Sequence, residues 1–425
     1  MSLDTARPFL LTDPRWLDYA KRILRIPEGR LKRRDFLAAS AVLSLLASSP
    51  ALAAKKTAAK KPPPKPASKP ANKPAASANA STTAQNEPRS VISFPDEPPA
   101  AWRTYDIRSS ITLNKIAGKT RIWLPLAQYK DTPWQRSLGH SWQGNFESAG
   151  IYRDPVAEME VFYADWKEGT ATPQLQIVSQ VATQDRHFDI TRRGAAVERN
   201  EVLRRCLHPT DLMPTDGLVR RTAERAIGRV KDPVAQGKAI YDWVVDNTTY
   251  DPLLPGCGIG DIATMLESGR PGGKSADIAL LFVALCRSMG IPARPVFGLR
   301  VDYSRLFGGL GATGKLANAQ HCRAEFYAPG YGWIPVDPSD VRKSILDEGL
   351  NSGDSKLVVL KKLLFGFWEM NWIGFNAAQD VDLRGTSSKT LPFLVFPQAE
   401  TENGRFDSLD AERFNYSVSA SRVEN

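Results

Sequence analysis

Three polar residues that lie far apart in the sequence could together attack a carbonyl group: Ser275, His321 and Asp337. Ser275 follows Gly272–Lys274 and precedes an apolar run, so we expect it in the first turn of a helix. Free backbone N–H groups and the positive end of the helix dipole favour a nearby anion there. This position therefore suits a nucleophile and one donor to an oxyanion, and it equally suits a plain N-cap serine.

The helix that carries Ser275 is expected to run to about Met289. Gly290 ends it, and Pro292 blocks its continuation. The residues between are apolar on nearly every side, which is typical of a buried central helix.

His321 and Asp337 are expected on the two strands of one hairpin. A turn centred near Pro329 would place them opposite each other, because both lie eight residues from that centre. A carboxylate in this position can fix the orientation and tautomer of an imidazole. An ordinary cross-strand polar pair is the alternative interpretation.

The order of these motifs resembles the transglutaminase-like superfamily. The likeness covers roughly residues 216–340, and the ordered set is far more specific than any single motif. In that family a cysteine at the helix start, a histidine and an aspartate form a papain-like triad. The resemblance therefore implies a papain-like fold and acyl transfer at amide bonds. The matching segments are Tyr241–Val244, Thr249–Asp251, Gly273–Ala279, Gly290–Arg294, His321–Glu325 and Gly332–Asp337.

Mapped residue by residue, His321 matches the family's histidine and Asp337 its aspartate, but Ser275 stands at the position of the cysteine. A thiol near a helix start and a protonated imidazole ionises to a thiolate. A serine hydroxyl must instead lose its proton during the attack. Three interpretations stay open: a cysteine-to-serine change, natural or engineered, that leaves a weak or inactive enzyme; a working serine hydrolase; and a site displaced onto another thiol. We carry the first forward as the prediction.

Cys257 is the candidate for a displaced site, because its glycine-rich loop, residues 254–261, is expected to approach the same cleft. Packing of a small residue in a tight loop is the alternative. The four cysteines and four histidines of the chain show no CxxC, HxxxH or HxxEH spacing. We therefore expect neither a metal site nor a bound cofactor.

Residues 1–53 predict a signal peptide of the twin-arginine type. Arg33 and Arg34 precede an apolar run from Phe36 to about Ala47, and small residues in an A-x-A arrangement follow. The run is shorter than the ~20 residues that span a membrane. Twin-arginine signals export folded proteins, so we expect the protein in the periplasm or cell envelope. An amphipathic helix followed by a buried helix is the alternative.

Residues 54–95 form a Lys/Pro/Ala-rich linker that contains no core-forming pattern. Residues 1–53 carry a net charge of +4 and residues 54–90 carry +7, so residues 91–425 carry −1 of the total of +10. A nucleic-acid-binding protein needs its basic surface on the folded body, so we exclude nucleic acid as a partner. The linker serves either as a solvated spacer or as a basic arm that contacts anionic envelope polymers.

The remaining residues predict an α+β protein. Apolar residues alternate from Trp102 to about Ile190, which indicates hairpins of an antiparallel, sandwich-like β domain over residues 96–200. Helical periodicity follows in residues 201–345, the expected transglutaminase-like core. We expect residues 346–425 to pack on that core as a C-terminal extension.

The resemblance implies peptidase, amidase or protein-glutamine crosslinking activity on protein or peptide substrates, including cell-wall peptides. In this scheme Ser275 attacks, His321 moves the proton and Asp337 orients His321. The alternative is a non-catalytic module, a pseudoenzyme whose degenerate cleft binds peptides or cell-wall stems. The sequence leaves open whether the chain is an active enzyme.

Overall fold

The computed structural model describes residues 101–424, apart from residues 190–192, 195–196 and 313–314. The predicted signal peptide (1–53) and linker (54–95) lie outside the described residues. In the part that the structure describes, no helix combines the length and apolar character needed to span a bilayer.

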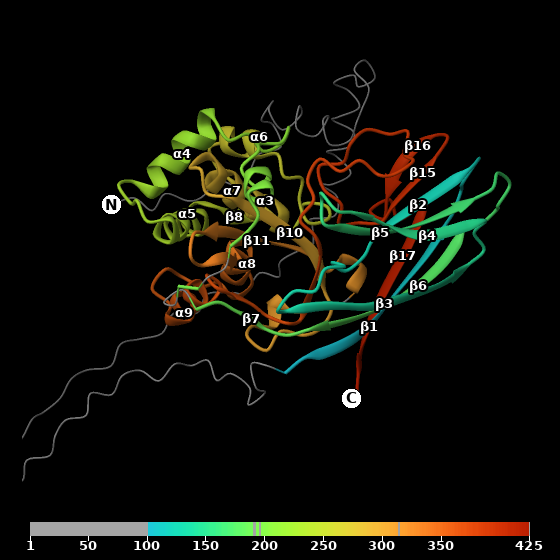
Figure 1. Ribbon diagram of the computed structural model, residues 1–425, viewed down its shortest axis with the longest axis horizontal. Coiled ribbons are helices and arrows are strands. Elements are labelled where there is room, and N and C mark those ends of the chain that lie inside the picture. The colour runs from blue at the N-terminus through green and yellow to red at the C-terminus, as the bar shows by residue number, and fades with distance from the viewer. Residues whose placement is uncertain (1–100, 190–192, 195–196, 313–314, 425) are drawn as a thin grey trace, which may run out of the picture. The chain divides into compact units, whose positions relative to one another are not determined.

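One part of the fold is a sandwich of two antiparallel sheets (Figure 1). Apolar side chains from both sheets form a core between them. Ile111 and Leu175 point inward from one sheet, and Ile122 and Phe162 from the other. Their alternation along the strands places them on the inner faces. In spatial order the first sheet contains β17 (Phe414–Val423), β1 (Arg103–Leu113), β6 (Gln174–Thr183) and β3 (Gln135–Gly144), and the second contains β16 (Gly404–Asp407), β15 (Gln398–Thr401), β2 (Thr120–Pro125), β5 (Met159–Trp166) and β4 (Ser148–Asp154).

The two hairpins predicted across the turns near residues 114–118 and 166–169 are wrong, although the consecutive strands β4 and β5 do form a hairpin. Strand β1 pairs with β6 and β17, whereas β2 pairs with β5 and β15. The turns at residues 114–118 and 167–169 therefore carry the chain from one sheet to the other. Alternation specifies which side chains face the core, but it does not specify which strand becomes the neighbour.

The C-terminal residues contribute to both parts of the fold. Strands β15 and β16 belong to the second sandwich sheet, and β17 forms an edge of the first. Strand β14 (Trp372–Asn376) pairs with β10 (Ala293–Arg300) in the core. The expected extension, residues 346–425, therefore supplies strands to the sandwich as well as to the core.

The second part of the chain is built on a four-stranded antiparallel sheet and helix α7 (Ser275–Ser288). The sheet has the order β12 (Gly332–Val336), β11 (Gln320–Ala328), β10 and β14. Every residue of α7 is buried, as its apolar sequence predicts. The helix packs against β10 and β11, so its first residue lies beside the strand that carries His321.

The remaining helices surround this core. Asp232 caps α5, accepting a hydrogen bond from the backbone N–H of Ala235, and Pro233 is the first helical residue, a pair that is typical of a helix start. The helices are α3 (Asn200–Arg205), α4 (Gly217–Ile227), α5 (Pro233–Asn247), α6 (Ile262–Glu267), α8 (Pro338–Glu348) and α9 (Ser355–Leu363); short strands are β7 (Arg186–His187), β8 (Thr249–Tyr250), β9 (Gly272–Gly273) and β13 (Phe367–Trp368), and 3-10 turns cover Gly308–Leu310 and Leu316–Asn318.

Candidate active site

The side chain of Asp277 links the start of α7 to the preceding loop, residues 254–261, by hydrogen bonds. One carboxylate oxygen accepts hydrogen bonds from the backbone N–H groups of Ile259 and Gly260 at 2.8 and 2.7 Å, and the other accepts from Lys274 N–H at 2.9 Å. Lys274 is the N-cap and Ser275 the first helical residue. Ser275 is therefore not a capping serine, and its hydroxyl is free for another role.

The Ser275 hydroxyl lies against strand β11. Its side chain is 2% exposed, and Oγ accepts a hydrogen bond of 3.2 Å from the backbone N–H of Cys322, the residue directly after His321. Among the described residues, the structure records no hydrogen bond between this hydroxyl and the His321 ring. The backbone N–H of Ser275 likewise meets no acceptor in the described part of the chain, so it can serve as an oxyanion donor.

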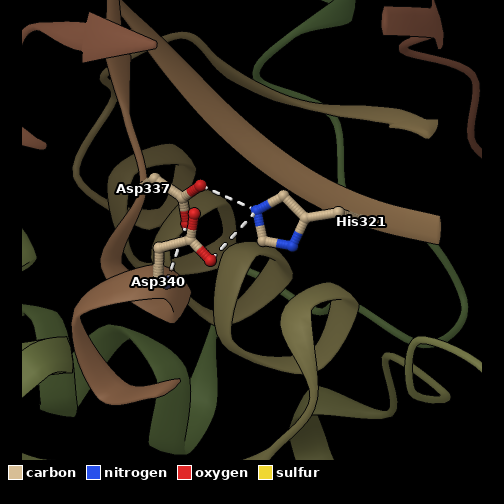
Figure 2. Close-up of side chains that lie close together, drawn as sticks. All are labelled: His321, Asp337 and Asp340. Atoms are coloured by element: carbon tan, nitrogen blue, oxygen red, sulfur yellow. Dashed lines mark hydrogen bonds and ion pairs between the residues drawn. The ribbon is translucent and has the colours of Figure 1, made fainter. Parts of the chain in front are cut away.

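His321 and Asp337 form a buried hydrogen-bonded pair. Nε2 of His321 lies 2.7 Å from Oδ2 of Asp337, and the two side chains are 5% and 1% exposed (Figure 2). A carboxylate only accepts hydrogen bonds, so Nε2 carries the hydrogen, and Nδ1 is the basic nitrogen of the neutral ring. Figure 2 shows Nδ1 on the side of the ring turned away from Asp337.

The two residues meet by a route that differs from the predicted hairpin. Strands β11 and β12 pair Ala324 with Val336 and Ala328 with Gly332, so the turn is centred on Gly330 rather than Pro329. Asp337 lies beyond the paired residues as the N-cap of α8, and its Oδ1 accepts from the backbone N–H of Asp340 at 3.0 Å. The aspartate thus reaches His321 from a helix start, where the Asp-Pro sequence favours a cap.

The charges around the ring favour a neutral histidine and an ionised aspartate. Burial lowers the pKa of His321, the positive charge of Arg300 lowers it further, and the two nearby carboxylates oppose this shift. Burial raises the pKa of Asp337, but His321, Arg323 and Arg300 together outweigh burial and bring the pKa below its ordinary value. A neutral imidazole oriented by a carboxylate is the state that a general base requires.

Three further charged residues of this site were not predicted from the sequence. Asp340 lies 3.6 Å from His321 Nε2, Arg300 lies 2.5 Å from Asp340, and Arg323 lies 3.3 Å from Asp337. For two of them the sequence contains a signal of a place near the triad. Arg323 is two residues after His321 and so lies on the same face of the strand, and Asp340 is three residues after Asp337 and so lies on the same face of the helix start. Nothing in the sequence pattern pointed to Arg300.

His321, Asp337 and Asp340 also bring potential metal-ligand atoms within 4.8 Å of one another. Their carboxylates, however, already form ion pairs with Arg300 and Arg323. A cation would have to displace a guanidinium from a buried pair, which is costly. Carboxylates that are already paired with arginines therefore favour a role of this cluster in proton transfer over a role in metal binding.

Cys257 does lie beside the candidate nucleophile, as the sequence suggested. Its carbonyl oxygen accepts a hydrogen bond of 2.8 Å from the backbone N–H of Ala276. The thiol is 2% exposed, and burial raises its pKa, so the reactive thiolate is disfavoured. Burial likewise raises the pKa of the thiols of Cys206, Cys286 and Cys322.

Comparison with known proteins agrees with the motifs. The family model of the transglutaminase-like superfamily matches residues 220–338. An uncharacterized protein of Haemophilus influenzae is 32% identical over 334 residues, which cover 74% of this chain and 88% of the relative.

Solved structures are more distant. A protein of Cytophaga hutchinsonii, assigned provisionally as a cysteine protease, is 18% identical, with a TM-score of 0.45 over 76% of this chain and 89% of its own. The periplasmic domain of TgpA from Pseudomonas aeruginosa is 16% identical, with a TM-score of 0.30 over 58% of this chain and 91% of its own. From the family match, the long relative and the core built on α7 and β11, we conclude that this chain belongs to the transglutaminase-like superfamily.

Proposed function

We propose that this protein is an exported member of the superfamily whose buried site at the start of α7 is built for acyl transfer at amide bonds of proteins or peptides. The observation that carries the proposal is the His321–Asp337 pair, 2.7 Å apart, beside Ser275 at the start of a buried helix. With Ser275 at the position of the family's cysteine, the protein is weakly active or inactive.

The proposed reaction has two stages. Ser275 Oγ attacks the amide carbonyl carbon, its proton passes to Nδ1 of His321, and the carbonyl oxygen becomes an oxyanion facing the Ser275 N–H. The C–N bond then breaks, the leaving amine takes the proton from His321, and an acyl ester remains on residue 275. Water attacks the ester for hydrolysis, or an amine attacks for transamidation, and its proton returns through His321 to the Ser275 oxygen.

Two features of the site support low activity in the serine form. The Ser275 hydroxyl accepts a hydrogen bond from Cys322 N–H and makes none to the His321 ring in the described part of the molecule. A serine hydroxyl also forms no resting anion, so it depends on that missing contact with the base. A thiol at position 275 can instead give its proton to His321 before the attack and rest as a thiolate beside the imidazolium.

The sequence supports export of the protein and a contact with the cell envelope. The Arg33–Arg34 signal pattern supports delivery to the periplasm or envelope, where peptide and cell-wall peptide substrates are available. The lysine-rich linker supports an electrostatic contact with anionic envelope polymers, a contact that rising salt would weaken.

The test is turnover by Ser275→Cys on peptide amide substrates, compared with the unmodified chain and with the double variant Ser275→Cys/His321→Ala. We expect clear turnover in Ser275→Cys, weak or no turnover in the unmodified chain, and none in the double variant. Released acid in water indicates a peptidase or amidase, and incorporation of a lysine amine indicates crosslinking.

No turnover by Ser275→Cys on any amide, combined with retained peptide or cell-wall binding, would favour the non-catalytic module. Turnover that survives His321→Ala would contradict the assigned base.

A further inference from the structure

The Nε2 atom of His321 faces two carboxylates rather than one. Oδ2 of Asp337 lies at 2.7 Å and Oδ1 of Asp340 at 3.6 Å (Figure 2). Both acids come from the first turn of α8, where Asp337 is the N-cap. The proposed triad accounts for Asp337 only, so the second carboxylate needs its own explanation.

Each carboxylate has its own buried guanidinium. Arg300 Nη2 lies 2.5 Å from Asp340 Oδ1, and Arg323 Nε lies 3.3 Å from Asp337 Oδ2. All four side chains are at most 7% exposed. Buried charges that are paired in this way can stay ionised beside the histidine, whereas an unpaired one would be strongly destabilising.

The single oxygen Oδ1 of Asp340 contacts both Arg300 and the histidine ring. Arg300 comes from β10 and also donates to the carbonyl of Leu310, which fixes its position. The backbone N–H of Asp340 in turn donates to Asp337 Oδ1. The ion pair with Arg300 therefore anchors Asp340 to the sheet, and the backbone N–H of Asp340 links it to Asp337.

We propose that Asp340, held by Arg300, is a positioning residue for His321. Its carboxylate adds a second negative charge at Nε2, so the ring keeps its Nε2–H toward the two acids and presents Nδ1 to the nucleophile. When Nδ1 accepts the proton, two carboxylates face the positive ring. The catalytic part of this inference rests on the proposed function, but the effect on the ring does not.

The direction of the effect follows from the charges. Burial and Arg300 lower the pKa of His321, whereas Asp340 and Asp337 raise it. Removal of Asp340 should therefore lower this pKa, because Arg300 then faces the ring uncompensated, and removal of Arg300 should raise it. The charged and titratable groups around this cluster are Arg300 from β10, Asp337 and Asp340 from α8, Arg323 from β11, Tyr241 from α5 and Tyr250 from β8.

The test is NMR of the full chain labelled with ¹⁵N-histidine, because only four histidines have to be assigned. We expect Asp340→Asn to shift the titration midpoint of His321 downward and to reduce the share of the Nε2–H tautomer. We expect Arg300→Gln to shift the midpoint upward. The opposite signs separate a charge effect from general loosening, and either variant decides the question if the other fails to fold.

The matched control is Glu160→Gln in the sandwich. Glu160 is also a buried carboxylate, and it lies 3.1 Å from Nε2 of His140. This variant should change the signals of His140 and leave those of His321 in place. If Asp340→Asn leaves both the tautomer and the midpoint of His321 unchanged, Asp340 only ties α8 to β10, and the proposal is wrong.

A second measurement tests catalysis. In the Ser275→Cys background, Asp340→Asn should lower kcat by roughly tenfold, the effect of one pKa unit of differential interaction, with little change in KM. An unchanged kcat would contradict a positioning role in turnover. If Ser275→Cys shows no turnover at all, the proposed function fails, while the NMR titration still decides the role of Asp340.

Discussion

Asp337 reaches His321 from the N-cap of helix α8, and its Oδ2 lies 2.7 Å from Nε2 of the ring. The same side chain accepts from Ser339 Oγ at 2.8 Å and from Asp340 N–H at 3.0 Å. One carboxylate thus starts a helix and orients the candidate base, which couples the stability of α8 to the chemistry of the site.

Asp337→Ala should therefore destabilise the fold strongly. It leaves Arg323 and His321 without their buried partner, and it removes the cap of α8. Breaking a buried ion pair typically costs about 3–5 kcal/mol of unfolding free energy, which urea denaturation would measure. Asp347→Ala is the control, because its pair with Lys343 is partly exposed, and it should cost at most about 0.5 kcal/mol. Equal effects of the two variants would contradict the assigned role of Asp337.

His321 should make the protein less stable in mild acid. Its folded-state pKa is lowered from 6.5, so between that lowered pKa and pH 6.5 the unfolded chain binds a proton that the folded chain does not. Stability therefore falls as the pH decreases through this window. Asp337, whose pKa is lowered from 3.8, adds a further loss at more acidic pH.

Urea denaturation at pH 7.5 and 5.5 would measure this loss. We expect a smaller loss in His321→Gln than in the unmodified protein, whereas His187→Gln, at an exposed strand position, should leave the loss unchanged. An equal loss with and without His321 would show that other groups cause the acid sensitivity.

Gly273 should be required for the geometry of the α7 start. Its φ is +148°, and a Cβ there would lie 2.3 Å from Oδ2 of Asp277, the carboxylate that fastens residues 259 and 260 to the helix. Gly273→Ala combines backbone strain with overlap, so we expect destabilisation of about 1–3 kcal/mol, measured by urea denaturation.

Gly269→Ala is the matched control, because Gly269 also has a positive φ, +70°, but a Cβ there would meet nothing within 4 Å. Its smaller loss would represent backbone strain alone. Equal losses would show that contact with Asp277 is unimportant.

Much of the core could be predicted from the sequence, because its signals are local. The apolar residues on nearly every side and the glycine at position 290 predict the helix that starts at Ser275. The Asp232-Pro233 pair marks the start of α5. The ordered motifs indicated the family. These features depend on residues close together in the chain, where periodicity and capping rules apply.

Other features could not be predicted, because they depend on long-range pairing. The placement of β17 beside β1 and the crossing between sandwich sheets have no local signature. The predicted hairpin register is wrong because the turn is centred on Gly330, and Asp337 lies beyond the paired strand as the cap of α8. Arg300 joins the site only after β10 and α8 pack together, whereas Asp340, three residues after Asp337 in the same helix turn, had a local signal that was not used.

The most direct test of the candidate site is the labelling of residue 275 by a thiol-reactive probe. Burial raises the pKa of all four native thiols and so disfavours the reactive thiolate, and the unmodified folded protein should therefore react little with iodoacetamide. We expect Ser275→Cys to gain one fast label, mapped to residue 275 by mass spectrometry, and Ser275→Cys/His321→Ala to lose most of that rate. Labelling of residue 275 that is no faster than that of the native cysteines, or equally fast without His321, would contradict a nucleophile–base pair at this site.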